Sequence, residues 1–280
     1  MNVRSDAVST VPATGRRYLE EQVRAYYRTL YQEWGCQHWW PARSRFEVIV
    51  GAYLTQNTAW TNVERALRKL RAGRALNLKG IRNTPLAELE QLIRSAGYFR
   101  QKARRLKTFV AFLDQHYNGS LDRMFAEPTH KLREELLALN GVGPETADSI
   151  LLYAGQHPVF VVDTYTRRIL DRHGILPANA PYEEIRALCE SALNGGMGVR
   201  GPAAVPRTAS SSAPPHGHGR PRLHLTSHSP SAMSMARRTP VAQVYNDMHG
   251  LIVGVGKHYC LKSAPKCDAC PLQKFLPGVK

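Results

Sequence analysis

The sequence predicts an all-α fold. Apolar residues recur at steps of three and four along much of the chain, as in the series Leu19, Val23, Tyr26, Leu30 and Trp34, which is the spacing of one helix face. No run of alternating apolar and polar residues is long enough to indicate a sheet. Residues 46–54 (FEVIVGAYL) have a strand-like composition, but their length, taken with that of 62–70, favours a helix buried on most sides.

The same periodicity places the other helices. They are expected at 18–34, 62–70, between Pro85 and Gly97, and at 102–116, 132–139, 146–154, 164–173, 182–193 and 241–255. Residues 1–15 are polar and are predicted to be a disordered lead.

A different composition marks residues 194–240. The stretch 191–240 holds six Arg, four His and seven Pro, and it lacks Lys, Asp, Glu, Phe, Tyr and Trp. Such a segment cannot bury a core, and it lies between two helical patterns. We therefore predict a disordered insert within a domain.

The charge balance favours nucleic acid as a partner. Lys and Arg number 38 against 22 Asp and Glu, which gives a net charge of +16. A polyanion such as nucleic acid is the first candidate and a membrane surface the second. No apolar stretch is long enough to span a membrane and no secretory signal is visible, so we expect a cytoplasmic protein that associates with the nucleoid.

The segment between 132–139 and 146–154 carries the most information. Gly141, Val142 and Gly143 permit a tight reversal between two helices and a close backbone approach to a ligand. The second helix then starts with unpaired N–H groups, at the positive end of its dipole, which suits a phosphate oxygen. Thr146 lies in its first turn. An ordinary helical corner is the alternative, but the pattern favours a hairpin that grips any duplex backbone.

Several segments of the chain together resemble a known family. Residues 139–170 (LNGVGPETADSILLYAGQHPVFVVDTYTRRIL), 46–66 and 97–103 are similar to the helix-hairpin-helix and Gly/Pro-Asp motif of endonuclease III-like DNA glycosylases. Trp39-Trp40-Pro41 and residues 54–58 (LTQNT) resemble the 3-methyladenine DNA glycosylase III branch most. The resemblance covers most of 18–193 and 241–276 and implies two helical lobes with an active-site cleft between them. The central lobe would span 44–158, with the hairpin motif at 132–154, and the second lobe would join 16–43 to 159–280.

The resemblance implies that Asp163 is the catalytic carboxylate. A carboxylate at the mouth of the pocket stabilises the positive charge that develops on the sugar, and it can orient or deprotonate water. Taken alone, Asp163 reads as a helix N-cap, and it can serve in both ways. Glu145 stands where bifunctional members carry a Schiff-base lysine, which predicts a monofunctional enzyme with a water nucleophile.

The resemblance also implies a base pocket and DNA contacts. Trp39, Trp40, Pro41 and Trp60 would line the pocket, since aromatic faces suit a cationic alkylated purine. Core packing is the alternative for each Trp. Gln56 and Asn57 would fill the gap that the flipped base leaves, unless they are buried helix-end amides. Lys102, Arg104, Arg105, Arg167 and Arg168 are candidate phosphate contacts.

The C-terminal cysteines resemble the iron–sulfur loop of the family at 258–276 but leave it incomplete. Cys260, Cys267 and Cys270 match three ligands, and Leu276 stands in the fourth place. A metal-free loop, a site completed by His258, and a labile four-iron cluster with an outside ligand all remain open. The chemistry requires no cofactor.

The sequence therefore indicates a monomeric glycosylase that flips a damaged base out of double-stranded DNA and hydrolyses its N-glycosidic bond. An alkylated base is the first candidate, and oxidised pyrimidines and mismatched thymine remain open. A bifunctional glycosylase/lyase using another amine, a non-catalytic DNA-binding paralogue and a hairpin module of a larger repair assembly are the alternatives.

Overall fold

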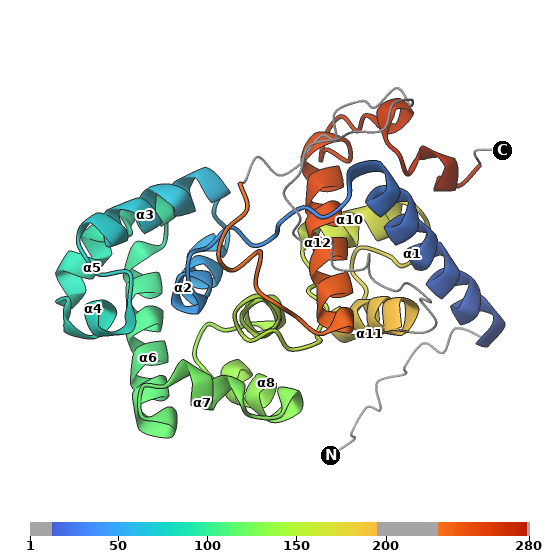
Figure 1. Cartoon of the computed structure of the whole chain (residues 1–280). Coiled ribbons are helices and arrows are strands. Elements are labelled where there is room, and N and C mark those ends of the chain that lie inside the picture. The colour runs from blue at the N-terminus through green and yellow to red at the C-terminus, as the bar shows by residue number, and fades with distance from the viewer. Residues whose placement is uncertain (1–12, 195–228, 279–280) are drawn as a thin grey trace, which may run out of the picture.

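The computed structural model describes residues 13–194 and 229–278 (Figure 1). Within these ranges every regular element is a helix, as the sequence predicted. The α-helices are α1 (Ala13–Trp34), α2 (Arg45–Thr55), α3 (Trp60–Ala72), α4 (Leu78–Asn83), α5 (Leu86–Leu92), α6 (Phe99–Tyr117), α7 (Leu121–Phe125), α8 (Thr129–Leu137), α9 (Pro144–Ser149), α10 (Thr164–Arg172), α11 (Tyr182–Asn194) and α12 (Pro240–His258). A π-helical turn, Ile150–Ala154, extends α9, and 3-10 turns lie at Arg94–Ala96, Cys267–Ala269 and Gln273–Phe275.

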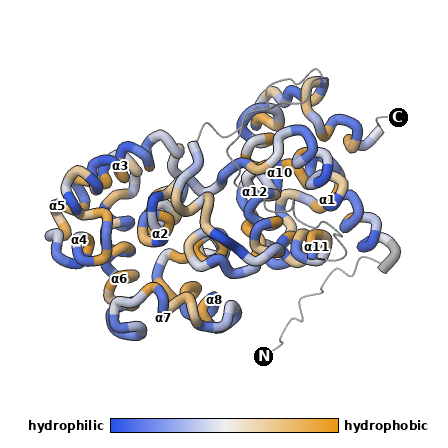
Figure 2. Tube along the Cα trace, viewed as in Figure 1, coloured by the Kyte–Doolittle hydropathy of each residue, from blue (hydrophilic) through white to orange (hydrophobic). Residues whose placement is uncertain are grey.

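The helices form two groups. Helices α2 to α8 lie on one side of Figure 1, and α1, α10, α11 and α12 pack on one another on the other side. Figure 2 shows hydrophobic residues recurring along most helices, and the core is built from such residues. Helix α2 is buried over nearly its whole length, so the apolar stretch 46–54 is a buried helix and not a strand.

Polar caps set where several helices begin. Ser44 accepts a hydrogen bond from the backbone N–H of Glu47 at the start of α2, and Asp163 accepts one from Thr166 at the start of α10. Asn77 and Ser120 cap α4 and α7 in the same way. These two short helices were missed by the periodicity, because six and five residues are too few to display it.

Two predicted disordered segments need correction. Helix α1 begins at Ala13, inside the predicted lead of 1–15. Residues 229–239, in the predicted insert of 194–240, pack against the chain near Trp40 (the orange segment leading into α12 in Figure 1). The Ser231 hydroxyl donates to the Trp40 carbonyl at 3.2 Å, and the Met233 N–H donates to the Ala42 carbonyl at 3.1 Å. The rest of both predicted segments, 1–12 and 195–228, lies outside the described residues.

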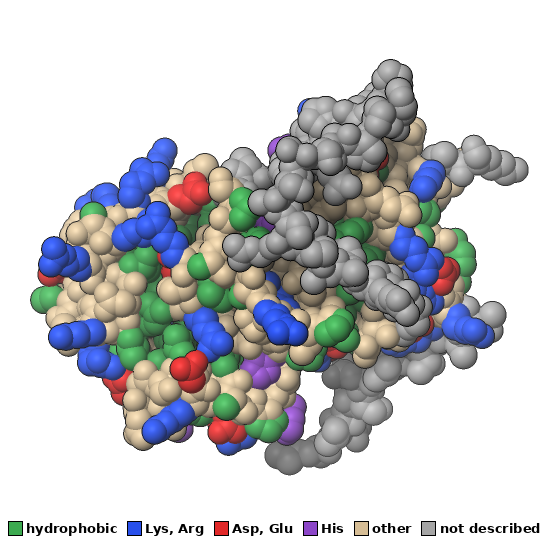
Figure 3. Space-filling model, viewed as in Figure 1, with side chains coloured by type: hydrophobic (Ala, Val, Ile, Leu, Met, Phe, Trp, Pro, Cys, Tyr) green, Lys and Arg blue, Asp and Glu red, His purple; other side chains and the backbone are tan. Residues whose placement is uncertain are grey.

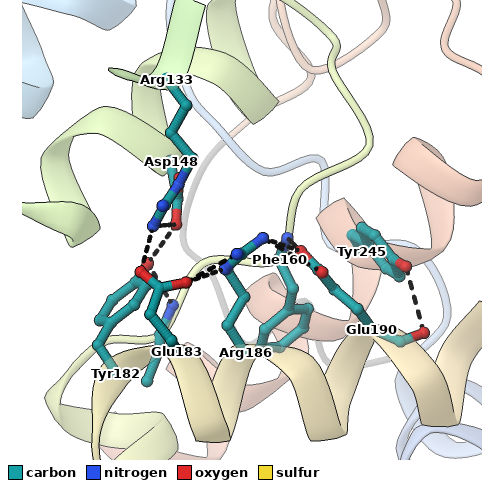
Figure 4. Close-up of polar contacts among 9 residues, drawn as sticks. Arg133, Asp148, Phe160, Tyr182, Glu183, Arg186, Glu190 and Tyr245 are labelled. Atoms are coloured by element: carbon teal, nitrogen blue, oxygen red, sulfur yellow. Dashed lines mark hydrogen bonds and ion pairs between the residues drawn. The ribbon is translucent and has the colours of Figure 1, made fainter. Parts of the chain in front are cut away.

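A buried polar network joins the two groups of helices (Figure 4). Arg133 on α8 donates to both oxygens of the fully buried Asp148, at 2.6 and 3.2 Å, and to Glu183 on α11 at 2.6 Å. The Tyr182 hydroxyl, also on α11, donates to Asp148 Oδ2 at 2.9 Å and accepts the Val162 N–H at 3.2 Å. The network therefore fixes the backbone immediately before Asp163.

We predict that Arg133→Met destabilises the protein by about 3–5 kcal/mol, because it leaves the Asp148 carboxylate buried without its charged partner. The free energy of unfolding in urea measures this. The matched control is Arg82→Met, which removes a two-bonded pair to Asp114 at the exposed surface and should cost much less. An equal loss of unfolding free energy in the two variants would show that the buried pair stabilises the protein no more than the exposed pair does.

Candidate active site

A cavity of about 790 Å³ lies where the two groups of helices meet. Its walls come from the Trp39–Trp40 segment, the turn after α2, the start of α9, the segment leading into α10, and α12. The lining residues include Trp39, Trp40, Gln56, Asn57, Trp60, Gly143, Glu145, Thr146, Asp163, Arg167, Tyr182, His249 and Lys257. The volume suits a small-molecule-sized group such as a single base.

Asp163 lies in the cavity wall with its two oxygens in different roles. Oδ1 accepts the Thr166 N–H at 2.8 Å and the Thr166 hydroxyl at 3.0 Å, so it caps α10. Oδ2 lies 3.6 Å from His249 Nε2. Capping therefore holds the carboxylate rigidly and leaves Oδ2 for the cavity.

Glu145 faces the same cavity from the first turn of α9. Solvent reaches it through the open cleft, yet protein surrounds it on the other sides. Burial in the cleft, reinforced by the charge of Asp163 and opposed by Arg167, raises the pKa of Glu145 to about 7. The cavity therefore holds two carboxyl groups in different environments, and Glu145 can retain a proton near neutral pH.

The predicted reversal between helices lies between α8 and α9. Gly141 has a φ of 78°, and a Cβ there would come within 1.9 Å of Arg105 Nε, so only glycine fits. Val142 is buried, whereas Gly143 is exposed with open space around it. Gly143 is therefore the part of the hairpin that a ligand can approach.

Gln56 ties the turn after α2 to this hairpin. Its Nε2 donates to the Gly141 carbonyl and to the Thr146 hydroxyl, both at 2.9 Å, and its Oε1 accepts from Arg105 at 2.8 Å. Asn57 is exposed at the cavity, with a φ of 50°. Of the two predicted gap-filling residues, Asn57 is thus the one with an exposed side chain.

Three tryptophans form an aromatic wall. The ring centroids of Trp40 and Trp60 are 5.3 Å apart, with the rings nearly perpendicular, and Trp39 lies 5.3 Å from Trp40. Trp39 and Trp40 are about 95% buried, so they pack the core and line the cavity at once. The Trp39–Trp40 peptide is cis. Pro41, predicted to line the pocket, is not among the lining residues.

The position of Lys102 contradicts its predicted role as a phosphate contact. It is 1% exposed, and its Nζ donates to the carbonyls of Leu54, Gln56 and Ala96 and to the Thr58 hydroxyl at 2.7–2.9 Å. Burial, with a smaller effect of Arg105, lowers the pKa of Lys102 to about 8. A lysine committed in this way clamps the end of α2 to α6 and does not contact phosphates.

The two arginines of α10 differ. Arg168 donates to the Cys260 carbonyl at 2.7 Å and to the Gly256 carbonyl at 3.0 Å, and it stacks over Tyr165, so it holds the C-terminal loop. This corrects the expectation of a free phosphate contact. Arg167 lines the cavity and donates to the Ala180 carbonyl at 2.6 Å. Other Lys and Arg side chains are spread over the face of the α2–α8 group (Figure 3).

The C-terminal cysteines do not fit a four-iron cluster. Cys260, Cys267, Cys270 and Leu276 share the walls of a cavity of only about 20 Å³. Arg172 donates to Cys260 Sγ at 3.2 Å and to the Leu261 carbonyl at 2.7 Å. In the described residues no group of three or more His, Cys, Asp or Glu side chains is arranged to hold a metal ion. Such a cluster uses four thiolates, and the loop offers three.

Sequence reasoning missed several residues of the site. His249, Tyr182 and Lys257 reach the cavity from α11 and α12, where nothing in the sequence separates them from other helical residues. The Lys257 ammonium lies 5.8 Å from the Trp39 ring centroid, and burial lowers its pKa.

The fold and the cavity define a helix-hairpin-helix DNA glycosylase. The family model described as HhH-GPD superfamily base excision DNA repair protein matches residues 50–194. The chain is also 37% identical, over 91% of its length and 96% of the relative, to a putative DNA repair glycosylase of Methanocaldococcus jannaschii. This protein therefore belongs to the HhH-GPD superfamily.

Solved structures show the same fold. The crystal structure of H. pylori 3-methyladenine DNA glycosylase (MagIII) bound to 1,N6-ethenoadenine is 28% identical, with a TM-score of 0.62 over 85% of this chain and 97% of that one. A trapped endonuclease III–DNA covalent intermediate has a TM-score of 0.60 at 22% identity, over 96% of this chain and 97% of that one. No helix among the described residues is both long enough and apolar enough to cross a membrane.

We predict that Gly141→Ala and Gly143→Ala differ sharply. The first forces a Cβ into Arg105 at a positive φ and should cost more than about 1 kcal/mol of stability. The second meets open space and should be close to neutral. Thermal unfolding of both variants checks this, and equal melting temperatures would contradict the tight reversal.

Proposed function

We propose that this protein excises an alkylated base from double-stranded DNA, with Asp163 as the catalytic carboxylate and water as the nucleophile. The observation that carries the proposal is the fixed Asp163 facing an aromatic, base-sized cavity. The bound 1,N6-ethenoadenine of the 28% identical H. pylori enzyme supports an alkylated purine as the substrate.

Each part of the cavity has a task in this scheme. The damaged nucleotide flips out of the duplex, and its base enters the cavity against Trp40 and Trp60. A cationic alkylated base is attracted by the ring faces. As the glycosidic bond breaks, Asp163 Oδ2 stabilises the positive charge on the sugar and directs water to C1′.

Glu145 supports hydrolysis over covalent catalysis. A carboxyl group cannot form the imine that a lysine forms at the equivalent place in bifunctional relatives. A protonated Glu145 can instead donate a hydrogen bond to an acceptor on the departing base. We propose this proton-donor role beside the ionic role of Asp163.

The hairpin, Asn57 and exposed basic residues hold the DNA in this proposal. Gly143 and the start of α9 approach the phosphate backbone, and Asn57 enters the space that the flipped base leaves. Arg104, exposed on α6, and Arg167, at the cavity wall, supply positive charge. Each of these contacts is independent of base sequence, as a repair enzyme requires.

Asp163→Asn is expected to reduce base release by at least about 100-fold, because the charge is lost while the capping oxygen remains. The measurement is the amount of free base released from methylated duplex DNA under single-turnover conditions. Asp171→Asn is the control, since Asp171 also lies on α10 and bonds to a backbone N–H, of Ala178, outside the cavity. Undiminished release by Asp163→Asn would remove Asp163 from the chemistry.

Glu145→Gln tests the proton-donor role by pH. With the pKa raised to about 7, wild-type Glu145 is protonated below that pH and loses its proton above it. The rate of release of a neutral damaged base should therefore fall as the pH rises through about 7, and Glu145→Gln should remove this limb. A limb that persists in the variant would assign it to another group.

A lyase activity is the second candidate, because Lys257 places an amine with a lowered pKa in the cavity. Borohydride trapping on duplex DNA that already contains an abasic site decides between the two. A covalent adduct that Lys257→Met abolishes would establish the lyase. Release of base without any adduct would leave the enzyme monofunctional, and tight DNA binding with neither activity would indicate a non-catalytic paralogue.

A further inference from the structure

A chain of three polar side chains runs from the aromatic wall to the candidate catalytic carboxylate. The Tyr153 hydroxyl, on the π-helical turn after α9, lies 2.6 Å from His249 Nδ1. The other ring nitrogen, Nε2, lies 3.6 Å from Asp163 Oδ2. His249 is 4% exposed and Tyr153 is fully buried, so the contact between these two side chains is shielded from bulk water.

His249 Nε2 is a buried polar atom without a hydrogen-bond partner among the described residues. Leaving such an atom unsatisfied costs about 1–3 kcal/mol, so the missing partner of His249 Nε2 requires an explanation. The nearest charged oxygen is Asp163 Oδ2, at slightly more than hydrogen-bond length. Catalytic hydrogen bonds are often long in the absence of substrate and tighten when it binds.

The surroundings select one tautomer of the ring. If Nε2 carried a lone pair, that lone pair would face a carboxylate oxygen and be repelled. The carboxylate therefore favours the N–H on Nε2, and in that tautomer Nδ1 accepts the proton of the Tyr153 hydroxyl. Tyrosine donates to histidine, and histidine donates toward aspartate.

Burial also favours the neutral form of the ring. Burial lowers the pKa of His249, although the charge of Asp163 acts in the opposite direction. The other charged or titratable groups near the pair are Glu145, Lys257, Tyr165 and Arg238. A neutral donor can orient a carboxylate without cancelling its negative charge, which an imidazolium would do.

We propose that His249 is a positioning residue that directs its Nε2–H at Asp163 Oδ2, with Tyr153 holding the ring in that tautomer. The proposal rests on the catalytic role of Asp163 proposed above. Thr166 and His249 then hold the carboxylate from both sides, one oxygen each. Tyr153 also packs against Trp40 at a centroid distance of 5.1 Å, so the same side chain supports the aromatic wall and the carboxylate.

Two substitutions at position 249 separate positioning from packing. In His249→Gln the amide nitrogen occupies the place of Nε2, so the donor toward Asp163 is kept. In His249→Asn the shorter amide reaches only the place of Nδ1, where its oxygen can accept from the Tyr153 hydroxyl, so that bond is kept and the donor toward Asp163 is lost. Both variants bury an amide at the same place, and thermal unfolding confirms that each is folded.

The kinetic readout is the single-turnover rate of base release, beside the affinity for duplex DNA with an abasic analogue. We expect His249→Asn to slow release by about 10- to 100-fold with unchanged DNA affinity, and His249→Gln to recover most of that loss. Tyr153→Phe should produce an intermediate loss. Equal rates in the Asn and Gln variants, or a loss that follows DNA affinity, would overturn the proposal.

A second readout needs no catalysis. Side-chain nitrogen NMR of the full chain, with His249→Gln used to assign the signal, reports the tautomer of His249 directly. We expect a neutral Nε2–H ring at pH 7, with a proton shift that changes in Asp163→Asn. An Nδ1–H ring, a charged ring, or a signal insensitive to Asp163→Asn would overturn the proposal even if base release is confirmed. If wild-type protein releases no base from any duplex, the proposed function fails, and the NMR result still decides whether His249 points its N–H at Asp163.

Discussion

The carboxylate of Asp163 is fixed through one oxygen and presented to the cavity through the other. Its first oxygen starts α10 by accepting the N–H and hydroxyl of Thr166. The backbone before it is held by the Tyr182 hydroxyl at Val162 and by the Glu190 carboxylate at Phe160. Helix α10 packs against α12, and α11 supplies Tyr182 and Glu190. The position of the Asp163 carboxylate therefore depends on these three helices and on the buried pair of Arg133 and Asp148. Rigidity here is useful, since preorganised charge stabilises a transition state without rearranging when the bond breaks.

Much of this could be predicted from the sequence, and the exceptions have physical reasons. The long helices, the hairpin at Gly141–Gly143 and the cap at Asp163 are encoded locally, by periodicity, glycine and a short polar side chain. Lys102 was misplaced because a lysine on an amphipathic helix looks solvated, and its four acceptors come from segments as far away as Leu54. Helices α4 and α7 were too short to show a period. Arg168 and His249 depend on contacts across α12, and no local pattern reports those.

The C-terminal loop, which has Leu276 in place of a fourth cysteine, is held by hydrogen bonds and apolar packing. Its backbone carbonyls at Cys260, Leu261 and Lys262 accept hydrogen bonds from Arg168 and Arg172 on α10. Leu272 is fully buried, and Phe275 packs against Tyr26 of α1 at 5.0 Å. Guanidinium groups and apolar packing thus hold the loop against the helix that begins at the proposed catalytic carboxylate.

Hydrogen bonds from Gln56 link the turn after α2 to the hairpin. Its amide nitrogen donates to Gly141 and Thr146 and its carbonyl oxygen accepts from Arg105, so the two segments that we propose to face DNA are held together. In the proposed reaction the duplex must deform to present the damaged base. The energy of that distortion depends on how strongly neighbouring bases stack, and a damaged base that stacks poorly lowers it. In the proposed enzyme, the free energy of deforming the duplex therefore contributes to the choice of lesion before the base contacts the cavity.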